Sequence, residues 1–227
     1  MQLRVFDLAI PRLPATTPAE HEGLLRDALR QKLAGVPLHR SFKVIKRALD
    51  TRRGGIKTIY TLDVEVPAAW GRRLLRLGRA QPVAQMPDPR FVLRRPPAQR
   101  PVIVGAGPAG LFAALTLAEA GARPIVLDRG KPVHPRARDV SRLYAQGILD
   151  PESNVCYGEG GAGTFSDGKL YTRVNDPRVG RILRLLVRHG GPQDILVDNR
   201  PHLGTDRNVA RIQVAEKARR ILLAVVV

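Results

Sequence analysis

Apolar and polar residues alternate along three segments in the first third of the chain. Leu3–Ile10 predicts an opening strand and Ser41–Asp50 predicts a second one. Within Ile56–Val66, isoleucine, threonine, tyrosine, leucine and valine occupy every second position and mostly polar residues stand between them. This pattern is typical of a strand with one buried face. Arg52–Gly55 supplies turn residues between the second and third strands.

A helix is predicted between the first two strands. Thr17-Pro18-Ala19-Glu20 has the spacing of a capping box, and Pro18 stands at the first helical position. Leu25, Leu29 and Leu33 follow at intervals of four, which places them on one helical face, and Gly35 can end the helix.

The order β-α-β-β predicts a small α+β domain of ferredoxin-like type at residues 1–66. Prolines interrupt the pattern from residue 67 onward, so residues 67–99 are predicted to be a Pro/Arg-rich connection. Phe91–Leu93 is the one stretch there that could add a short strand.

The apolar run Pro101–Val104 leads directly into Gly105-Ala106-Gly107-Pro108-Ala109-Gly110. Apolar residues at helical spacing follow and stop near Gly121. A second apolar run, Ile125–Leu127, ends in Asp128. Strand, glycine turn, helix, strand and acid in this order form the dinucleotide-binding fingerprint of a Rossmann-type domain. The fingerprint favours a binding turn over a glycine-rich turn that binds nothing.

Each part of the fingerprint has a physical role. Gly105 permits the tight turn, Gly107 lets the backbone approach a pyrophosphate, and Gly110 lets the helix pack closely. The positive end of the helix dipole receives the phosphates. Asp128 can accept hydrogen bonds from ribose hydroxyls and would repel a 2′-phosphate, which disfavours NADP at this site. The fingerprint alone leaves FAD and NAD open.

A second glycine-rich segment holds five glycines within the eleven residues Gly158–Gly168. This density argues against a regular strand or helix. A bare backbone suits close approach by a flat or phosphorylated ligand, but a mobile surface loop fits the residues equally well.

Several of these segments together resemble a known family, the bacterial FAD-dependent dehydrogenases of unassigned substrate, of the FAD-dependent protein C type. The segments that carry the resemblance are Gly105–Gly110, Asp128-Arg129-Gly130, Ser153-Asn154 with Gly158–Leu170, Pro201–Asp206 and, near the start, Lys46–Arg52. The glycine segment is the longest and most specific of them.

The resemblance implies an FAD-binding oxidoreductase whose Rossmann-type domain is residues 100–227. Gly105, Gly107 and Gly110 would bind the pyrophosphate and Asp128 the adenosine ribose. Arg129 and Arg136 would neutralise phosphate or cover the adenine. The second glycine segment would pass beside the pyrophosphate, the ribityl chain or the flavin through Gly160, Gly161, Ala162, Gly163, Thr164 and Ser166. NAD(P)H is one candidate electron donor, and no catalytic side chain or substrate is implied.

The resemblance stops near Asp206, whereas members of the family continue for roughly as long again. The late strand ending in Gly-Asp that such flavoproteins use has no counterpart here, and Thr205 or Asp206 is better interpreted as a helix N-cap. The final residues, Ile221–Val227, are all apolar. We therefore expect a truncated or frameshifted gene product with an incomplete Rossmann domain.

The net charge of +18 introduces a competing interpretation. Such a surplus suggests a nucleic-acid-binding module, above all in residues 1–99, which carry +11. However, 31 of the 38 basic residues are arginine, and Trp70 is the one aromatic among four neighbouring arginines, whereas stacking platforms interleave several. A solvated basic face is favoured. An NAD-binding dehydrogenase and an inactive fragment remain as further alternatives.

The remaining chemistry of the sequence is sparse. Cys156 has no partner for a disulfide and is expected to be a buried structural residue. His202 is interpreted as structural rather than as an acid or base, and the histidines show no metal spacing. The sequence contains no apolar run long enough to span a membrane and no signal peptide, so a cytoplasmic protein acting on an unknown small molecule is expected. The oligomeric state is not indicated.

Overall fold

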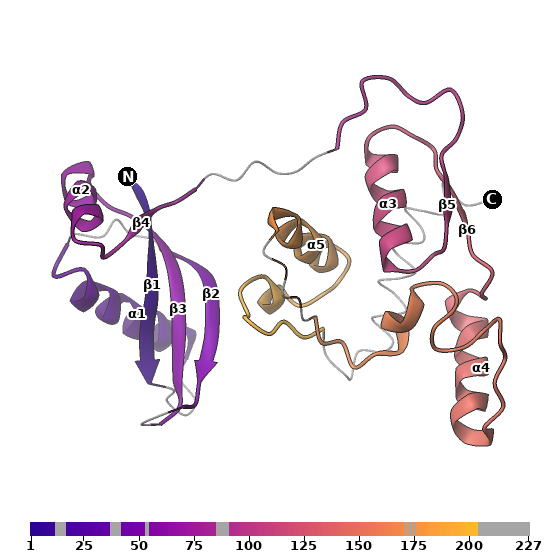
Figure 1. The fold of residues 1–227 in the computed structure, drawn as a ribbon. Coiled ribbons are helices and arrows are strands. Elements are labelled where there is room, and N and C mark those ends of the chain that lie inside the picture. The colour runs from indigo at the N-terminus through magenta and orange to yellow at the C-terminus, as the bar shows by residue number, and fades with distance from the viewer. Residues whose placement is uncertain are drawn as a thin grey trace. The chain divides into compact units, whose positions relative to one another are not determined.

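The computed structural model describes residues 1–11, 17–36, 42–52, 55–84, 91–170, 172, 174 and 176–203. The chain divides into two compact units, each described here by itself (Figure 1). The first unit comprises Met1–Pro87 together with Gln193–Pro201, and the second comprises Asp88–Pro192 and resumes at His202.

The first unit is built on an antiparallel sheet in the order β2-β3-β1-β4. The three predicted strands are confirmed as β1 (Gln2–Pro11), β2 (Phe42–Asp50) and β3 (Lys57–Glu65). The short strand β4 (Gln81–Pro82) pairs with the start of β1. The Arg4 side chain of β1 donates to the carboxylate of its cross-strand partner Asp63 at 2.7 Å and 2.9 Å, which reinforces the central pairing.

The predicted helix is confirmed as α1 (Pro18–Lys32), and both bonds of its capping box form. The Thr17 amide donates to the Glu20 carboxylate at 2.7 Å, and the Glu20 amide donates to the Thr17 hydroxyl at 3.3 Å. The bonds from the Thr17 backbone and hydroxyl hold the pKa of Glu20 below its ordinary value. Gly35 follows the end of the helix with φ +73°, a conformation that glycine adopts without strain.

Removing the hydroxyl of Thr17 tests how much the capping box contributes to the free energy of unfolding. We expect Thr17→Ala to lower the free energy of unfolding by about 1 kcal/mol, because the Glu20 amide loses its acceptor. Urea titration followed by circular dichroism measures the change. Thr17→Ser, which keeps the hydroxyl, should retain most of the stability. An equal loss in both variants would show that the cap is not responsible.

The interval predicted to be a connection, residues 67–99, contains regular structure. Helix α2 (Ala68–Arg76) and strand β4 both lie in it and belong to the first unit, so this unit extends past the predicted boundary at residue 66. The prolines that suggested an irregular segment stand mainly after residue 81, beyond the helix. The short strand expected at Phe91–Leu93 does not form.

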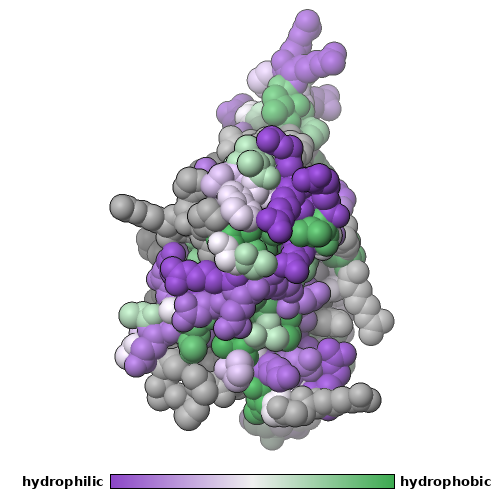
Figure 2. Space-filling model, turned by 90° about the vertical axis from the view of Figure 1, so that its left-hand side faces the viewer, coloured by the Kyte–Doolittle hydropathy of each residue, from purple (hydrophilic) through white to green (hydrophobic). Residues whose placement is uncertain are grey.

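Both helices of the first unit contribute to one hydrophobic core against the sheet. The core combines leucines of α1 and α2 with inward-facing residues of β1 and β3, among them Leu3, Leu29, Leu62 and Leu74. Trp70 packs partly buried against this core, and the Arg73 guanidinium lies 5.5 Å from its ring centroid. The ring is therefore part of the packing rather than an open stacking platform. Hydrophilic side chains cover much of the face seen in Figure 2, with apolar ones scattered among them.

A segment distant in sequence contacts one edge of this sheet. Gln193–Pro201, which includes the 3₁₀ helix η2 (Gln193–Leu196), meets β2 at Arg47. The Arg47 amide donates to the Val197 carbonyl at 2.8 Å, and the Asn199 amide donates to the Arg47 carbonyl at 2.9 Å. The Arg47 guanidinium also pairs with the Asp198 carboxylate. We call this segment the edge strap.

The second unit begins with a β-α-β succession, which confirms the predicted strand, glycine turn, helix and strand. Strands β5 (Val102–Val104) and β6 (Ile125–Leu127) pair in parallel, and α3 (Pro108–Glu119) connects them. A small core beneath the helix contains Ala106, Ala114 and Val126.

Three further elements complete the described part of this unit. They are α4 (Val133–Gln146), the 3₁₀ helix η1 (Gly161–Phe165) and α5 (Pro177–Arg188). η1 corrects the expectation that the second glycine segment holds no helix, because five of its residues wind into a short one. The sequence analysis did not predict α5. The Asp176 carboxylate caps it by accepting from the Arg178 amide at 2.8 Å, and it also accepts from the Arg178 guanidinium at 2.8 Å and 2.6 Å. The guanidinium bonds, together with the smaller effect of the amide bond, lower the pKa of Asp176 to about 2.

Three sequence-based expectations concern residues outside the described ones. They are the turn residues Arg53 and Gly54, the N-cap at Thr205 or Asp206, and the apolar run Ile221–Val227. Among the helices of the described residues, none combines the length and apolar character needed to cross a membrane.

Candidate functional site

The predicted glycine turn, Gly105–Gly110, connects β5 to α3. Gly105 has φ +100°, and its amide donates to the Leu127 carbonyl of β6. Gly107 occupies the N-cap of α3 without a side-chain cap, and Pro108 opens the helix. A Cβ at Gly107 would meet no atom of the described chain within 4 Å. The N–H groups of the first helical turn have no acceptor within the helix, so this end can receive an anion.

Gly110 has a different role, because a Cβ there would overlap the carbonyl oxygen of Gly105 and stand 3.4 Å from the Ile103 side chain. The first turn of α3 therefore packs directly on the backbone of the glycine turn. The two glycines therefore have different roles. The missing Cβ at Gly107 leaves open space next to the turn, whereas the missing Cβ at Gly110 allows the helix to pack against the Gly105 carbonyl.

The Asp128 carboxylate ties the end of β6 to the glycine turn. Its Oδ2 accepts from the Ala106 amide at 2.6 Å and its Oδ1 accepts from the Gly130 amide at 2.7 Å. Each carboxylate oxygen can accept a second hydrogen bond, so both keep capacity for a ligand hydroxyl. Asp128, which the sequence pattern assigns to a ribose, also holds the glycine turn.

The second glycine segment lies against the glycine turn. The Gly160 amide donates to the Ala106 carbonyl at 2.8 Å, and a Cβ at Gly161 would stand 3.1 Å from the Pro108 ring. Gly158, Gly160 and Gly161 all have positive φ values, which side chains strain to adopt. We call Gly158–Ser166 the glycine loop. Of the two interpretations open from sequence, a ligand-approaching loop or a mobile surface loop, this packing favours the first.

Arg136 of α4 holds the glycine loop from inside the protein. Its side chain is fully buried and donates to the Glu159 carbonyl at 2.6 Å and to the Gly161 carbonyl at 2.5 Å. The guanidinium lies over the Phe165 ring at 4.7 Å, while Nε has no partner among the described atoms. Burial lowers the pKa of Arg136, and the nearby carboxylate of Asp128 opposes this effect.

This placement differs from the expected role of Arg136. A fully buried guanidinium whose terminal nitrogens donate to backbone carbonyls supports the loop and does not cover a base. Arg129, by contrast, is exposed, pairs with Glu152 at 3.2 Å and stacks on the Tyr157 ring at 4.3 Å. It therefore remains available at the surface beside Asp128.

The other predicted residues of the loop lie where its backbone is accessible. Ala162 and Gly163 are exposed within η1. The Thr164 hydroxyl donates to the Glu159 carbonyl at 3.1 Å, and the Ser166 hydroxyl donates to the Gly163 carbonyl at 3.1 Å. Ala109 stands exposed in the first turn of α3. The hydroxyls of Thr164 and Ser166 thus stabilise the loop by bonding to its own carbonyl groups.

Sequence reasoning missed the role of Glu159. Its carboxylate accepts from the Val133 amide at 2.9 Å and so caps the N-terminus of α4, while its carbonyl accepts from Arg136 and Thr164. Glu159 is visible within the glycine-rich segment of the sequence. Nothing near it indicates that its partner is the amide of Val133, 26 residues earlier at the start of α4.

A buried polar cluster fixes the approach to the glycine loop and was also missed. The Asp139 carboxylate accepts from Lys131 Nζ at 2.8 Å and from the Ser153 hydroxyl at 2.6 Å. These two donors hold the pKa of Asp139 below its ordinary value. The Asn154 side chain accepts from the Cys156 amide at 2.9 Å. Ser153 and Asn154 are thus structural supports of the loop that follows them.

Cys156 and His202 complete the predicted candidates. Cys156 is exposed, which corrects the expectation of a buried thiol. His202 forms an isolated antiparallel bridge with Lys169, which stands three residues after the glycine loop. The described residues contain no group of His, Cys, Asp or Glu suited to a metal ion.

The glycine turn leaves an open helix N-terminus that can receive an anion, and a family comparison indicates which cofactor the region binds. Residues 100–142 match the family model described as FAD binding domain. This segment contains the glycine turn, Asp128 and Arg136. FAD is the cofactor that the domain indicates.

One relative is an uncharacterized protein of Clostridium beijerinckii, 52% identical over 107 residues. The alignment covers 47% of this chain and 20% of the relative. The chain therefore spans about a fifth of the length of the relative that it matches.

The residues present fit FAD at its diphosphate end. The space beside Gly107 is one that a Cβ would occupy, and a diphosphate needs such an approach at a helix N-terminus. The glycine loop adds a second stretch of bare backbone against the same turn. The Asp128 oxygens retain acceptor capacity for a ribose.

Neutralising Asp128 should weaken cofactor binding. In Asp128→Asn, one of the two backbone amides faces an NH₂ group instead of an acceptor, so the glycine turn loses a charge-assisted bond. We expect an affinity for FAD about 10-fold lower or weaker still, measured by quenching of flavin fluorescence on titration. Asp27→Asn removes an exposed acid of α1 in the first unit and should bind as the wild type does. Equal binding by Asp128→Asn would contradict the assigned role.

Proposed function

We propose that this chain carries the cofactor-binding part of an FAD-dependent oxidoreductase. The observation that carries the proposal is the contact between two glycine segments, Gly105–Gly110 and Gly158–Ser166, at the N-terminus of α3. The first of these segments lies within residues 100–142, which match an FAD-binding domain. Neither segment alone identifies a flavin site, whereas their contact sets a second glycine-rich backbone, exposed at Ala162 and Gly163, against the turn that opens α3.

The proposal gives each residue a task. The first turn of α3 and Gly107 bind the diphosphate, and Asp128 accepts from the adenosine ribose while it holds the turn. The glycine loop, supported from below by Arg136, contacts the cofactor with its exposed backbone. When bound, FAD supplies two-electron redox chemistry at its isoalloxazine ring, and the protein sets its orientation and access.

The proposal extends to the architecture of both units. The parallel strands β5 and β6 with α3 between them support a Rossmann-type domain. In the first unit, the order of elements β-α-β-β-α-β and the strand order β2-β3-β1-β4 support a ferredoxin-like arrangement.

Flavin content of the purified chain tests the proposal directly. We expect the protein to carry, or to take up, FAD with the visible absorbance of oxidised flavin, and heat denaturation should release FAD rather than FMN. A colourless protein that binds NAD and takes up no FAD would reject the proposal in favour of a nicotinamide-binding dehydrogenase.

Gly107→Ala separates loss of binding from loss of folding. The new methyl group meets no described atom and the φ of −70° suits alanine, so the melting temperature should not fall. The same methyl group occupies the space proposed for the diphosphate, and we expect FAD affinity to drop at least about 10-fold. Gly23→Ala, at another open position in α1, is the matched control. Unchanged FAD affinity in Gly107→Ala would place the diphosphate elsewhere.

A further inference from the structure

Four arginines of the first unit gather on the outer side of α2 and on the turn that follows it. The four exposed residues are Arg72, Arg73, Arg76 and Arg79. The helix turns its other side to the core, where Gly71 and Leu74 are buried. The side of the first unit that carries α1 and α2 faces the viewer in Figure 2, and hydrophilic side chains cover much of it. We call the four residues the arginine face.

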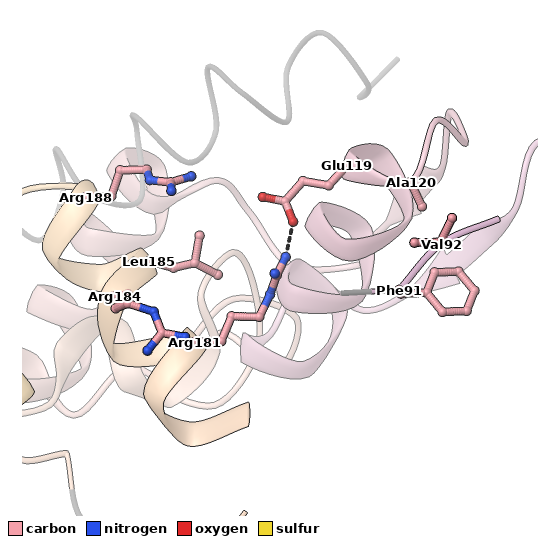
Figure 3. Close-up of a pocket in the computed structure, with 8 residues that line it drawn as sticks. All are labelled: Phe91, Val92, Glu119, Ala120, Arg181, Arg184, Leu185 and Arg188. Atoms are coloured by element: carbon pink, nitrogen blue, oxygen red, sulfur yellow. Dashed lines mark hydrogen bonds and ion pairs between the residues drawn. The ribbon is translucent and has the colours of Figure 1, made fainter. Parts of the chain in front are cut away.

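Within the described part of the chain, no carboxylate pairs with the arginine face. The sequence has no Asp or Glu in residues 66–87, which surround these arginines. Arg79 donates to a backbone group instead, the Lys32 carbonyl at 3.5 Å. Arginines elsewhere do find acids, as Arg181 of α5 pairs with Glu119, a contact marked in Figure 3. The arginine face therefore presents four positive charges without an acid to balance them.

This arrangement opposes helix formation. Arg76 stands four residues after Arg72 and three after Arg73, and like charges at these intervals destabilise a helix. The helix dipole favours Arg73 and Arg76, which lie in the last turn of α2. Arg72 lies earlier in the helix and gains little from the dipole. A bound polyanion would remove the repulsion among the guanidinium groups.

The surroundings of the arginine face indicate which polyanion fits. A membrane-binding helix needs an apolar face for the bilayer, but α2 packs its apolar side into the protein through Leu74 and Leu75, and Leu77 alone is exposed beyond its end. A single-stranded nucleic acid needs open aromatic rings on which its bases stack. The aromatic ring of α2, Trp70, packs against the core, and Arg73 lies over it. The face thus offers charge without a surface for insertion or stacking.

We propose that the arginine face binds the sugar-phosphate backbone of a nucleic-acid duplex. Helix α2 has nine residues, which makes it about 14 Å long. One strand of a duplex carries a phosphate about every 3.4 Å of its axis, so about four phosphates lie along such a helix, one for each arginine. Guanidinium groups bind phosphate oxygens through paired hydrogen bonds. The surface belongs to the first unit and does not depend on the proposed flavin function.

Fluorescence anisotropy of a labelled DNA duplex, titrated with the full chain, measures the binding. Four phosphate contacts predict that affinity falls about 100-fold as salt rises from about 50 mM to about 200 mM, whatever the base sequence. Arg72→Gln with Arg76→Gln should weaken binding about 100-fold at the lower salt concentration and halve the slope of log affinity against log salt. Both side chains are exposed, so the melting temperature should not fall.

Two further double variants separate the surface from the net charge. Arg94→Gln with Arg95→Gln removes the same charge from exposed positions of the second unit and should bind as the wild type does. Arg72→Lys with Arg76→Lys keeps the charge of the arginine face. It should keep the salt slope, because counterion release depends on charge.

Three results would overturn the proposal. The first is a loss of affinity in Arg72→Gln with Arg76→Gln that is absent or no larger than the loss in Arg94→Gln with Arg95→Gln. The second is a single-stranded oligonucleotide of the same length that binds more tightly than the duplex. The third is displacement of the duplex by phosphatidylserine vesicles at an equal concentration of phosphate, which would indicate a membrane surface.

Discussion

Gly110→Ala is expected to destabilise the second unit by about 3 kcal/mol and to abolish FAD binding. The added Cβ would overlap the Gly105 carbonyl oxygen, a backbone atom that cannot rotate away, so α3 must move off the glycine turn. The movement also carries the helix N-terminus away from the diphosphate. The gain in helix propensity from glycine to alanine, about 1 kcal/mol, offsets only part of the cost.

Chemical denaturation followed by circular dichroism measures the loss of stability, and flavin fluorescence measures the loss of binding. Gly107→Ala makes the same chemical change three residues earlier and should lose binding without losing stability. If Gly110→Ala were as stable as Gly107→Ala, the close packing of α3 on the turn would be refuted.

Arg136→Met should lower the free energy of unfolding by about 2 to 4 kcal/mol. The methionine fills much of the same volume and contacts Phe165, but it leaves the carbonyls of Glu159 and Gly161 without their donor. Part of the loss is recovered because a buried cation with an unpartnered Nε is removed. The glycine loop then loses its support, so FAD affinity should fall together with stability.

The comparison with Arg136→Lys separates charge from geometry. A lysine keeps the positive charge but cannot reach both carbonyls with a planar fork. In urea titrations, we expect Arg136→Lys to recover less than half of the free energy of unfolding that Arg136→Met loses. Arg138→Met, an exposed position on the same helix, should leave stability and binding unchanged. Full FAD affinity in Arg136→Met would show that the loop holds its shape without the arginine.

The glycine turn could be predicted from sequence because its determinants are local. Gly105, Gly107 and Gly110 stand at fixed spacing between a strand and a helix. The structure shows a positive φ at Gly105, close packing at Gly110 and open space beside Gly107. The capping box of Thr17 and Glu20 was predictable for the same reason.

The remainder of the site depends on contacts between distant residues. The hydrogen bond from the Gly160 amide to the Ala106 carbonyl joins positions 54 residues apart. No pattern in the sequence around either residue predicts this contact. The resemblance assigned Arg136 to phosphate or adenine, and nothing in the sequence indicates that this arginine is fully buried, which is rare for the residue type. Its carbonyl partners become visible only in the packed loop.

Two helices were missed although their signals were present. Asp176-Pro177 is an N-cap followed by proline at N1, the same signal that revealed α1. Helix α2 begins after Pro67 and buries Leu74, but its short length and its arginines made the segment look like part of a proline-rich connection.

The edge strap has a consequence for synthesis of the chain on the ribosome. Arg47 and Asp198 are 151 residues apart, so β2 leaves the ribosome long before the segment that covers its edge. During that interval the edge of β2 can pair with another chain. Charged side chains on β2, including Lys43 and Lys46, oppose such pairing. The strands of the first unit are therefore synthesised before the edge strap, and the backbone bonds at Arg47 can form only after Asn199 has been synthesised.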